Sequence, residues 1–370
     1  LGDVYKRQVM YPISGILVDR FGPKKVMFLG ILAWSAACIG GGLSTNMEQF
    51  AFFRGLLGLA EPTIFAGQIV AVTVWFEKRQ RATANSLCTA GGSIGTVVAP
   101  IVIAWLSTIF PWNDVFVLAG AIGILIAIVW MAVYADPPKE ILDVTLSESA
   151  ANRHHGKAFT WGGLWKTRTL WGVLLIRFVS DPVWYFCLFW LPGYLQEDSG
   201  LTLIQVGWVG WIPFLFGAVG GVLTSAWSDK MVRKGMDPLR ARKRMMTLVA
   251  VAAPLCIFTP YFNALPPYWN VAAIIASFSL IAIMCLSWLY TICVVIAEAF
   301  PVRNVASVVG ITAGFGAVGG AIFNYYVGQL LSTMGPSLFL VMGVLHWIAV
   351  VILWKMTRPE IPQEKQAVQK

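Results

Sequence analysis

Two ionisable residues, Arg54 and Glu61, stand seven positions apart in the apolar segment FFRGLLGLAEP (52–62). Seven positions are about two helical turns, so both side chains lie on one helix face, roughly 10 Å apart along its axis. Ionisable groups deep in an apolar helix are costly unless they face a wet cavity or a partner. A desolvated carboxyl group can bind and release a proton as access to water changes, so Glu61 is the predicted proton carrier. Arg54 is predicted to bind a carboxylate or to neutralise Glu61; the alternative is a structural ion pair with another helix.

The segment RFVSDPVWYF (177–186) contains a second charged pair. Arg177, Asp181 and Trp184 fall on one helical face, and Asp181 lies roughly 15 Å into its apolar run, near the middle of a ~30 Å membrane core. Pro182 is predicted to kink the helix there. Aromatic rings beside a charged pair suit a polyol ligand, whereas the alternative is an internal ion pair that only offsets its own burial. The predicted substrate-binding residues here are Arg177, Asp181, Trp184 and Tyr185, joined by Ser287 and Trp288 from a later run.

A third pattern, GILVDRFGPKK (15–25), ends one apolar run and has a weaker echo in SDKMVRKG (228–235). An aspartate here can interact with the positive end of a neighbouring helix, while the basic residues face lipid headgroups. A plain charged turn would explain the lysines but not the glycines and aspartate at this spacing. The predicted gating residues are Gly15, Asp19, Arg20, Gly22, Asp229 and Lys230.

A second echo relates ATANSLCTAGGSIG (82–95) to ASVVGITAGFGAVGG (306–320). The glycine pairs Gly91/Gly95 and Gly310/Gly314 at small-xxx-small spacing predict close approach of neighbouring helices. Internal repetition on this scale is typical of membrane transporters, whose substrate sites lie near the membrane midplane between the repeats.

The elements that must position these residues are membrane helices. The 370 residues are 58% hydrophobic and 12% charged, with a mean hydropathy of +0.71, whereas about a quarter of the residues in a soluble domain are charged. Runs of roughly 20 apolar residues cross a membrane as helices. The predicted spans are 9–18 (a half-helix), 25–43, 48–75, 83–108, 114–135, 170–196, 205–227, 245–263, 269–298, 305–332 and 336–355. The fold class is an all-α membrane protein.

Basic residues alternate between loops. Of the 27 lysines and arginines, all but Lys6, Arg7, Arg54 and Arg177 lie in every second loop, at the helix ends beside it or in the C-terminal tail. The positive-inside rule therefore places those loops and the C-terminus in the cytoplasm, and the formal charge of +9 needs no nucleic-acid partner. Neither a metal-ligand spacing nor a phosphate-binding loop occurs. We expect no metal, no cofactor and no enzyme activity; a proton gradient would supply the energy.

The longest basic connection divides the chain. The predicted segments are 9–135 (first helical bundle), 136–168 (central cytoplasmic loop), 169–357 (six-helix second bundle) and 358–370 (cytoplasmic tail). Residues 1–8, LGDVYKRQ, are polar, lack an initiating Met and join abruptly to a half-helix. We therefore expect them to be foreign or mis-joined sequence, with one helix and part of the next missing before residue 9.

With these patterns, and with RGLLGLAE, WFEKRQRATANS and RFVSDPVWYFCLFWLPGYL, the chain from about residue 9 resembles the anion:cation symporter family of the major facilitator superfamily, most closely its bacterial hexuronate transporters. The resemblance implies two pseudo-symmetric six-helix bundles, here without the first helix and part of the second. It further implies proton-coupled uptake of a sugar acid (hexuronate or aldonate) or related organic anion, by alternating access, in a bacterial inner membrane and as a monomer. In that family the fourth helix carries an arginine and, two turns on, a glutamate implicated in substrate binding and proton coupling, which match Arg54 and Glu61. The eleventh helix departs from the family pattern at Gly310 to Ala313.

Two other functions compete with this interpretation. Proton-coupled efflux is typically marked by adjacent Gly and Pro in the fifth helix, whereas Gly95 and Pro100 are separated here. An intramembrane arginine also suits an anion better than a cationic drug. A membrane sensor that binds its ligand without moving it is the alternative of another class, and the polar loops are too short for an appended signalling domain.

Overall fold

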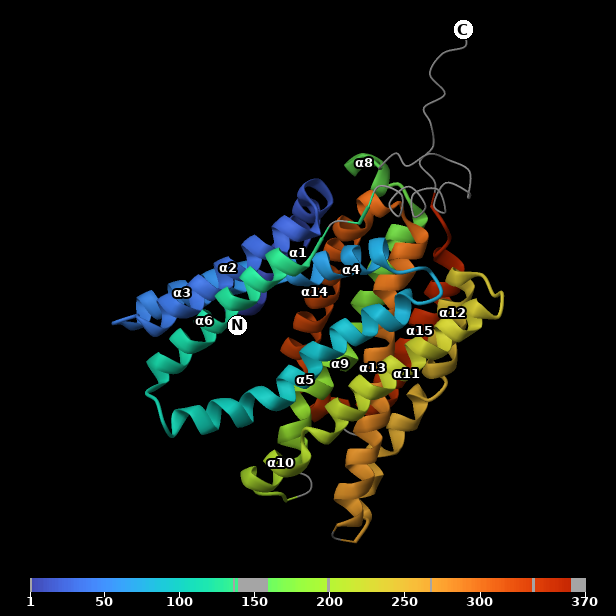
Figure 1. Ribbon diagram of the computed structural model, residues 1–370. Helices are drawn as coiled ribbons and strands as arrows, with labels where there is room; N and C mark the ends of the chain where they lie inside the picture. Colours follow the sequence, from blue (N-terminus) through green and yellow to red (C-terminus); the bar gives the residue numbers. More distant parts are fainter. Residues whose placement is uncertain are drawn as a thin grey trace.

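The computed structural model describes residues 2–135, 137–138, 159–197, 200–266, 268–334 and 337–360. Every element in these ranges is a helix (Figure 1). The first half contains α1 (Gly2–Phe21), α2 (Pro23–Gly42), α3 (Met47–Ala60), α4 (Pro62–Trp75), α5 (Arg81–Ser107) and α6 (Trp112–Val133). The second half contains α8 (Trp161–Leu164), α9 (Arg168–Glu197), α10 (Leu203–Val209), α11 (Ile212–Arg233), α12 (Pro238–Ala250), the 3-10 helix η1 (Ala253–Ala264), α13 (Trp269–Ala299), α14 (Val302–Met334) and α15 (Ser337–Met356).

Each predicted span is helical over most of its described length, and nine spans in the described residues are long and apolar enough to cross a membrane. Three single spans of the prediction are divided. The span 48–75 is interrupted between α3 and α4, 205–227 between α10 and α11, and 245–263 changes from α-helix to 3-10 helix between α12 and η1. Prolines follow each interruption at Pro62, Pro213 and Pro254, where the missing N–H removes a helical hydrogen bond.

The half-helix predicted over 9–18 is longer in the structure. α1 runs from Gly2 to Phe21, so the polar residues after Leu1 continue the helix rather than preceding it. Their foreign origin stays a prediction, as do the boundaries of the segments. Most of the central loop, residues 139–158, and the tail from residue 361 lie outside the described residues.

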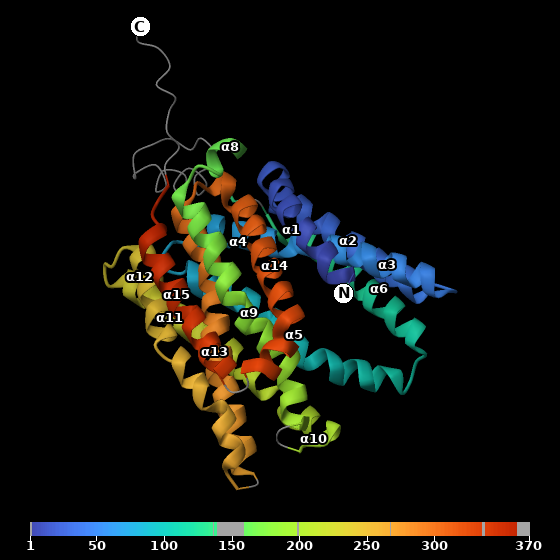
Figure 2. The same cartoon turned by 180° about the vertical axis from the view of Figure 1, so that it is seen from behind.

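The two halves meet along two helix pairs. α1 packs along α14, and α5 packs along α11, as both views of the ribbon show (Figures 1 and 2). In the same views α2, α3 and α6 lie on the outer side of α1, away from α14. We call the end of the molecule where Arg20, Arg233 and Lys355 close their helices the basic end.

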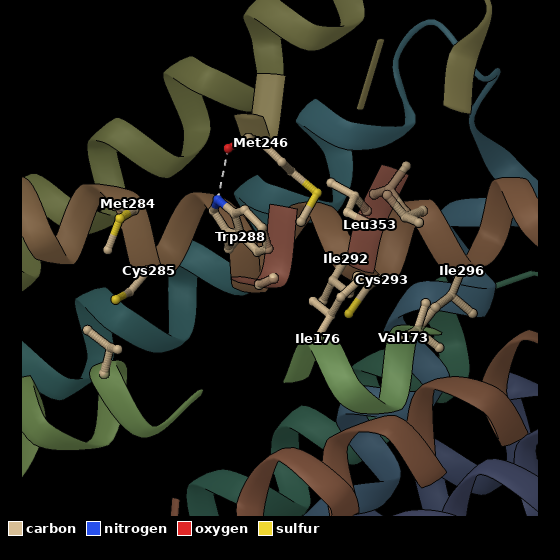
Figure 3. Packing of buried hydrophobic residues seen from close by; sticks show 14 of the residues in the cluster. Val173, Ile176, Met246, Met284, Cys285, Trp288, Ile292, Cys293, Ile296 and Leu353 are labelled. Carbon is tan, nitrogen blue, oxygen red and sulfur yellow. Dashed lines mark hydrogen bonds between the residues drawn. The ribbon is translucent and has the colours of Figure 1, made fainter. Parts of the chain in front are cut away.

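The core of the second half is built around α13. Its side chains pack against α9, α12 and α15, and the Trp288 indole N–H donates to the carbonyl oxygen of Met246 at 3.0 Å (Figure 3). Apolar residues from four helices close this core; in Figure 3 they include Val173, Ile176, Met284, Ile292, Ile296 and Leu353. α13 also packs along α11, so it contacts both α9 and α11, which carry predicted site residues.

Candidate functional site

The first contact between the halves, the Asp19 contact, joins α1 to the start of α14 at the basic end. The Asp19 carboxylate accepts the backbone N–H of Ala306 at 3.1 Å and that of Ser307 at 2.7 Å. Ala306 and Ser307 are the fifth and sixth residues of α14, and hydrogen bonds from backbone N–H groups stabilise a carboxylate. Asp19 of the first half is therefore hydrogen-bonded to a helix of the second half, and its gating role stays a prediction.

Two glycines allow α1 and α14 to approach at this contact. A Cβ atom at Gly15 would lie 2.3 Å from the carbonyl oxygen of Ala306, and one at Gly310 would lie 2.2 Å from that of Tyr11. These distances are far below van der Waals contact, so only glycine fits. Gly22 has a different reason to be glycine, because its φ of 83° lies in the left-handed region. Arg20 is exposed, and its guanidinium lies over the Phe21 ring.

The second contact, the Asp229 contact, joins α11 to the start of α5. The Asp229 carboxylate accepts the Thr83 backbone N–H at 2.7 Å and the Thr83 hydroxyl at 2.6 Å. Thr83 and Ser307 hold the same position in the echo between residues 82–95 and 306–320. The two contacts are therefore internal repeats of one another. Lys230, the neighbour of Asp229, is exposed.

A buried ionic cluster surrounds the Asp229 contact, and sequence analysis missed most of it. Arg242 of α12 pairs with Asp229 at 2.7 Å and donates to the Ser228 hydroxyl at 2.7 Å. Glu298 of α13 pairs with Arg81 of α5 at 3.4 Å and lies 4.0 Å from Arg242. Arg242 and Glu298 are almost fully buried, so their charges depend on one another. Arg81 and Arg242 belong to the basic set that the topology rule explained, which hid this second role.

A chain of polar side chains continues from this cluster between the halves. Gln68 of α4 donates to Asn85 at 3.3 Å and to Thr89 at 2.7 Å. The Asn85 amide in turn donates to the backbone carbonyl oxygen of Tyr290 in α13 at 2.8 Å. Three helices from both halves are thus hydrogen-bonded at this level. The echo in the sequence pointed to the segment 82–95 but not to these partners.

Glu61 and Arg54 lie on the interrupted helix of the first half. Glu61 is the residue between α3 and α4, half-buried and directly before Pro62. Arg54 is exposed on α3, whereas Gly55 and Gly58 of the same helix are buried. Glu61 is thus the last residue before the helix is interrupted at Pro62. The proton-carrying role of Glu61 and the carboxylate-binding role of Arg54 stay predictions.

Arg177 and Asp181 of α9 form an ion pair of 2.9 Å, and both residues are buried. α14 covers the pair with Gly316, at which a Cβ atom would lie 2.0 Å from Asp181 Oδ2. α9 runs unbroken from Arg168 to Glu197, so Pro182 does not end the helix. The internal ion pair, the alternative left open by the sequence, is thus present. It leaves open a further role for these two residues.

The aromatic residues next to the pair are half-buried. The Trp184 ring meets Phe214 of α11 edge-on, with centroids 5.8 Å apart. The Tyr185 ring lies parallel to that of Phe189 with centroids 6.1 Å apart, and it fills the space left by Gly320 of α14. Trp184 therefore packs against α11 and Tyr185 against α14, both in the second half.

Ser287 and Trp288 are buried with their hydrogen-bonding groups used inside the second half. The Ser287 hydroxyl lies 2.6 Å from the Ile283 carbonyl oxygen and 2.8 Å from the Thr224 hydroxyl. Trp288 donates to Met246, as described above. In this conformation neither side chain presents an unused donor to a ligand. Their substrate-binding role stays a prediction.

The prediction of close helix approach is correct at Gly310 and wrong at Gly91 and Gly95. Gly310 lies against α1, but a Cβ atom at Gly91 or Gly95 would meet nothing within 4 Å. Both glycines are exposed, whereas the adjacent Ala90 packs against Ala218, Leu286 and Tyr290, so the two glycines lie on the side of α5 that faces away from its neighbours.

Comparison with known proteins gives relatives along most of the chain. The hexuronate transporter of Escherichia coli (strain K12) is 26% identical over 360 residues, which cover 94% of this chain and 81% of that protein. The D-galactonate transporter of Escherichia coli O6:H1 (strain CFT073) is 28% identical, with coverages of 91% and 82%. A probable L-galactonate transporter of Escherichia coli (strain K12) is 32% identical over 238 residues, or 62% of this chain and about half (52%) of that protein.

Two solved structures share the fold. The proton:xylose symporter XylE aligns with a TM-score of 0.73 at 13% identity, covering 96% of this chain and 84% of its own. The Escherichia coli fucose:proton symporter FucP aligns with a TM-score of 0.69 at 14% identity, covering 96% and 89%. The family model of the Major Facilitator Superfamily matches residues 8–294. With two helical bundles joined by repeated contacts and relatives that are transporters, the chain belongs to the Major Facilitator Superfamily as a multi-pass membrane protein.

Proposed function

We propose that this protein takes up a sugar acid, a hexuronate or aldonate, together with protons. The observation that carries the proposal is the similarity to hexuronate and galactonate transporters over more than nine-tenths of the chain. The intramembrane arginines Arg54 and Arg177 support an anionic substrate, because a guanidinium binds a carboxylate with two parallel hydrogen bonds. A charged side chain is costly in a helix that faces only lipid, so an arginine in a membrane span is expected to have a polar partner or a ligand.

The two repeated contacts support alternating access as the mechanism. The Asp19 and Asp229 contacts both lie at the basic end and join opposite halves. We place this end, with the C-terminus, in the cytoplasm of a bacterial cell, on the inner membrane, by the positive-inside rule. With both contacts formed, the conformation is closed toward the cytoplasm. Substrate then enters from outside, and release inside requires both contacts to break.

The site residues have separate roles in this proposal. Glu61 carries the proton, since it lies at the break between α3 and α4 on the same helix as Arg54. Arg54 receives the substrate carboxylate, since it is an exposed arginine in a membrane-spanning helix. Trp184 and Tyr185 offer ring faces to the apolar side of the sugar. One chain supplies both halves of the pathway, so a monomer suffices.

Uptake by reconstituted protein tests the proposal. Proteoliposomes are given a panel of labelled hexuronates, aldonates and neutral sugars, with and without an inward proton gradient. We expect accumulation of at least one sugar acid, stimulated by the gradient, and none of the neutral sugars. Uptake that is the same with and without the gradient contradicts proton coupling. Export of substrate in exchange for protons would instead support efflux. Saturable binding without transport would support a sensor.

A further inference from the structure

A small cavity lies inside the second bundle, beside the Arg177–Asp181 ion pair. Its volume is about 10 Å³, which is close to the space that a single water molecule needs. α9 lines it with Arg177, Ser180 and Asp181, α15 lines it with His346, and most of the remaining wall is apolar or aromatic surface of α13. Asp181 is the fourteenth residue of α9, about 20 Å from its start at about 1.5 Å per residue. The cavity is therefore deep within the membrane-spanning part of the bundle.

The polar groups around this cavity are incompletely hydrogen-bonded. Arg177 uses one nitrogen for Asp181, while its Nε and Nη1 have no hydrogen-bond partner of ordinary geometry in the described residues. His346, which is 0% exposed, interacts with the Met342 backbone one turn earlier in α15, and otherwise its ring nitrogens have no hydrogen-bond partner of ordinary geometry in the described residues. The Trp288 ring lies edge-on to the imidazole, with centroids 5.3 Å apart, and fixes its orientation. Buried polar groups in native proteins are almost always satisfied by protein or by ordered water, and here one water can reach both walls.

We propose that Arg177, Asp181 and His346 hold one buried water and form a proton-binding site inside the second bundle, separate from Glu61. The water accepts a hydrogen bond from Arg177 and donates one to the unprotonated nitrogen of His346. Asp181 takes the proton. The role of this site in a transport cycle rests on the proposed function, but the site itself can be tested without any substrate.

The proton step is simple and balanced. A proton adds to the Asp181 carboxylate and gives a neutral carboxylic acid, so the net charge of the cluster changes from zero to +1. Only the ion pair with Arg177 is lost. The guanidinium keeps its charge because it does not deprotonate in proteins. It then requires a different anion, and the carboxylate of an organic anion has the matching chemistry.

The surroundings contain no other charged side chain that could balance this change, within the described residues. α14 presents Gly316, which has no side chain, and the nearby titratable groups on α9, α13 and η1 are the thiols of Cys187, Cys256, Cys285 and Cys293. α15 contributes only His346. Since α14 packs directly on the ion pair and also carries Ser307, a change in the pair acts on the helix that holds the Asp19 contact.

Infrared difference spectroscopy on the purified protein across a pH series tests the site directly. We expect a carboxylic acid band that appears as the pH falls, is absent in Asp181→Asn and is retained in Asp229→Asn, which removes a buried carboxylate elsewhere. In His346→Gln, which keeps a hydrogen-bonding end but does not titrate, we expect the midpoint of the band to move. A merely structural role for His346 would change stability and leave that midpoint in place.

Two results would overturn the proposal: a titrating band that persists in Asp181→Asn, or a midpoint identical in the wild type and His346→Gln. If Asp181→Asn does not fold, the His346→Gln comparison decides alone. The outcome is also separate from that of the uptake assay. A titrating band with gradient-independent uptake leaves the site standing and rejects proton-coupled transport, whereas proton-coupled uptake without the band leaves Glu61 as the carrier and rejects this site.

Discussion

The Ser307 backbone N–H donates to Asp19 at 2.7 Å, across 288 positions of the chain. The Thr83 backbone N–H donates to Asp229 at the same distance. Each bond joins a carboxylate of one half to the early residues of a helix in the other half. Two related contacts therefore join the halves at the basic end, and they differ in their further partners: Asp19 also accepts the Ala306 backbone N–H, whereas Asp229 also accepts the Thr83 hydroxyl and pairs with Arg242.

Replacing Asp19 with Asn is expected to weaken the closed conformation. A hydrogen bond to a charged group contributes about 1.5–3 kcal/mol, so the closed population should fall by roughly 10- to 150-fold relative to the open one. The measurement is maleimide labelling of a cysteine introduced at Val309, which is buried just beyond the contact. Labelling should be faster in Asp19→Asn. Lys25→Gln, at an exposed basic residue of the same turn, is the control, and equal rates in all three proteins contradict the gating role.

Replacing Gly15 with Ala should separate α1 from α14. The added Cβ would lie 2.3 Å from a backbone oxygen, which cannot move aside as a flexible side chain can. We expect a loss of thermal stability of about 1–3 kcal/mol, typical of overpacking, and faster labelling at the Val309 position. Gly91→Ala has open space around its Cβ and should be stable. A Gly15→Ala protein with wild-type melting and labelling would show that the close approach is not required.

Replacing Glu298 with Gln should destabilise the fold through its two arginine partners. Arg81 and Arg242 would remain close to each other in a buried site, and breaking a buried ion pair on one side costs about 3–5 kcal/mol. The measurement is the melting temperature in detergent. Arg79→Ala is the matched control, since the Arg79–Glu77 pair is exposed and such pairs contribute at most about 1 kcal/mol. Equal melting of both variants would mean that the buried cluster is not a stabilising one.

Replacing Glu61 with Gln should abolish gradient-driven accumulation and spare exchange of substrate across the membrane. Glutamine keeps the size and hydrogen-bonding ability of the side chain but carries no proton. The two rates are compared in proteoliposomes, with and without an imposed pH step. Glu48→Gln, at the exposed first turn of α3, should behave as the wild type. Concentrative uptake that survives Glu61→Gln would remove this residue from proton coupling.

The sequence by itself determined the class of the protein and the course of its helices. Apolar runs and the alternation of basic loops are local properties, because each helix satisfies its own backbone hydrogen bonds in the membrane. Gly15, Asp19 and Gly22 are close together in the sequence, so they were recognisable as a motif. The Arg177–Asp181 pair was predictable for the same reason, because its residues stand at i and i+4 of one helix. The echo of residues 82–95 in 306–320 also correctly indicated a repeat.

Only the tertiary structure decided which residues meet. Periodicity gives the face on which Asp229 lies, but its partners Thr83 and Arg242 come from other helices and depend on how those helices cross. The predicted ligand residues Ser287 and Trp288 have their polar groups engaged by Thr224, Ile283 and Met246, which no local pattern reveals. His346 stands alone in its apolar run, and it is a candidate for chemistry only because α9, α13 and α15 together enclose a space the size of one water. Contacts of this kind are set by the packing of whole helices, and a single sequence contains no direct record of them.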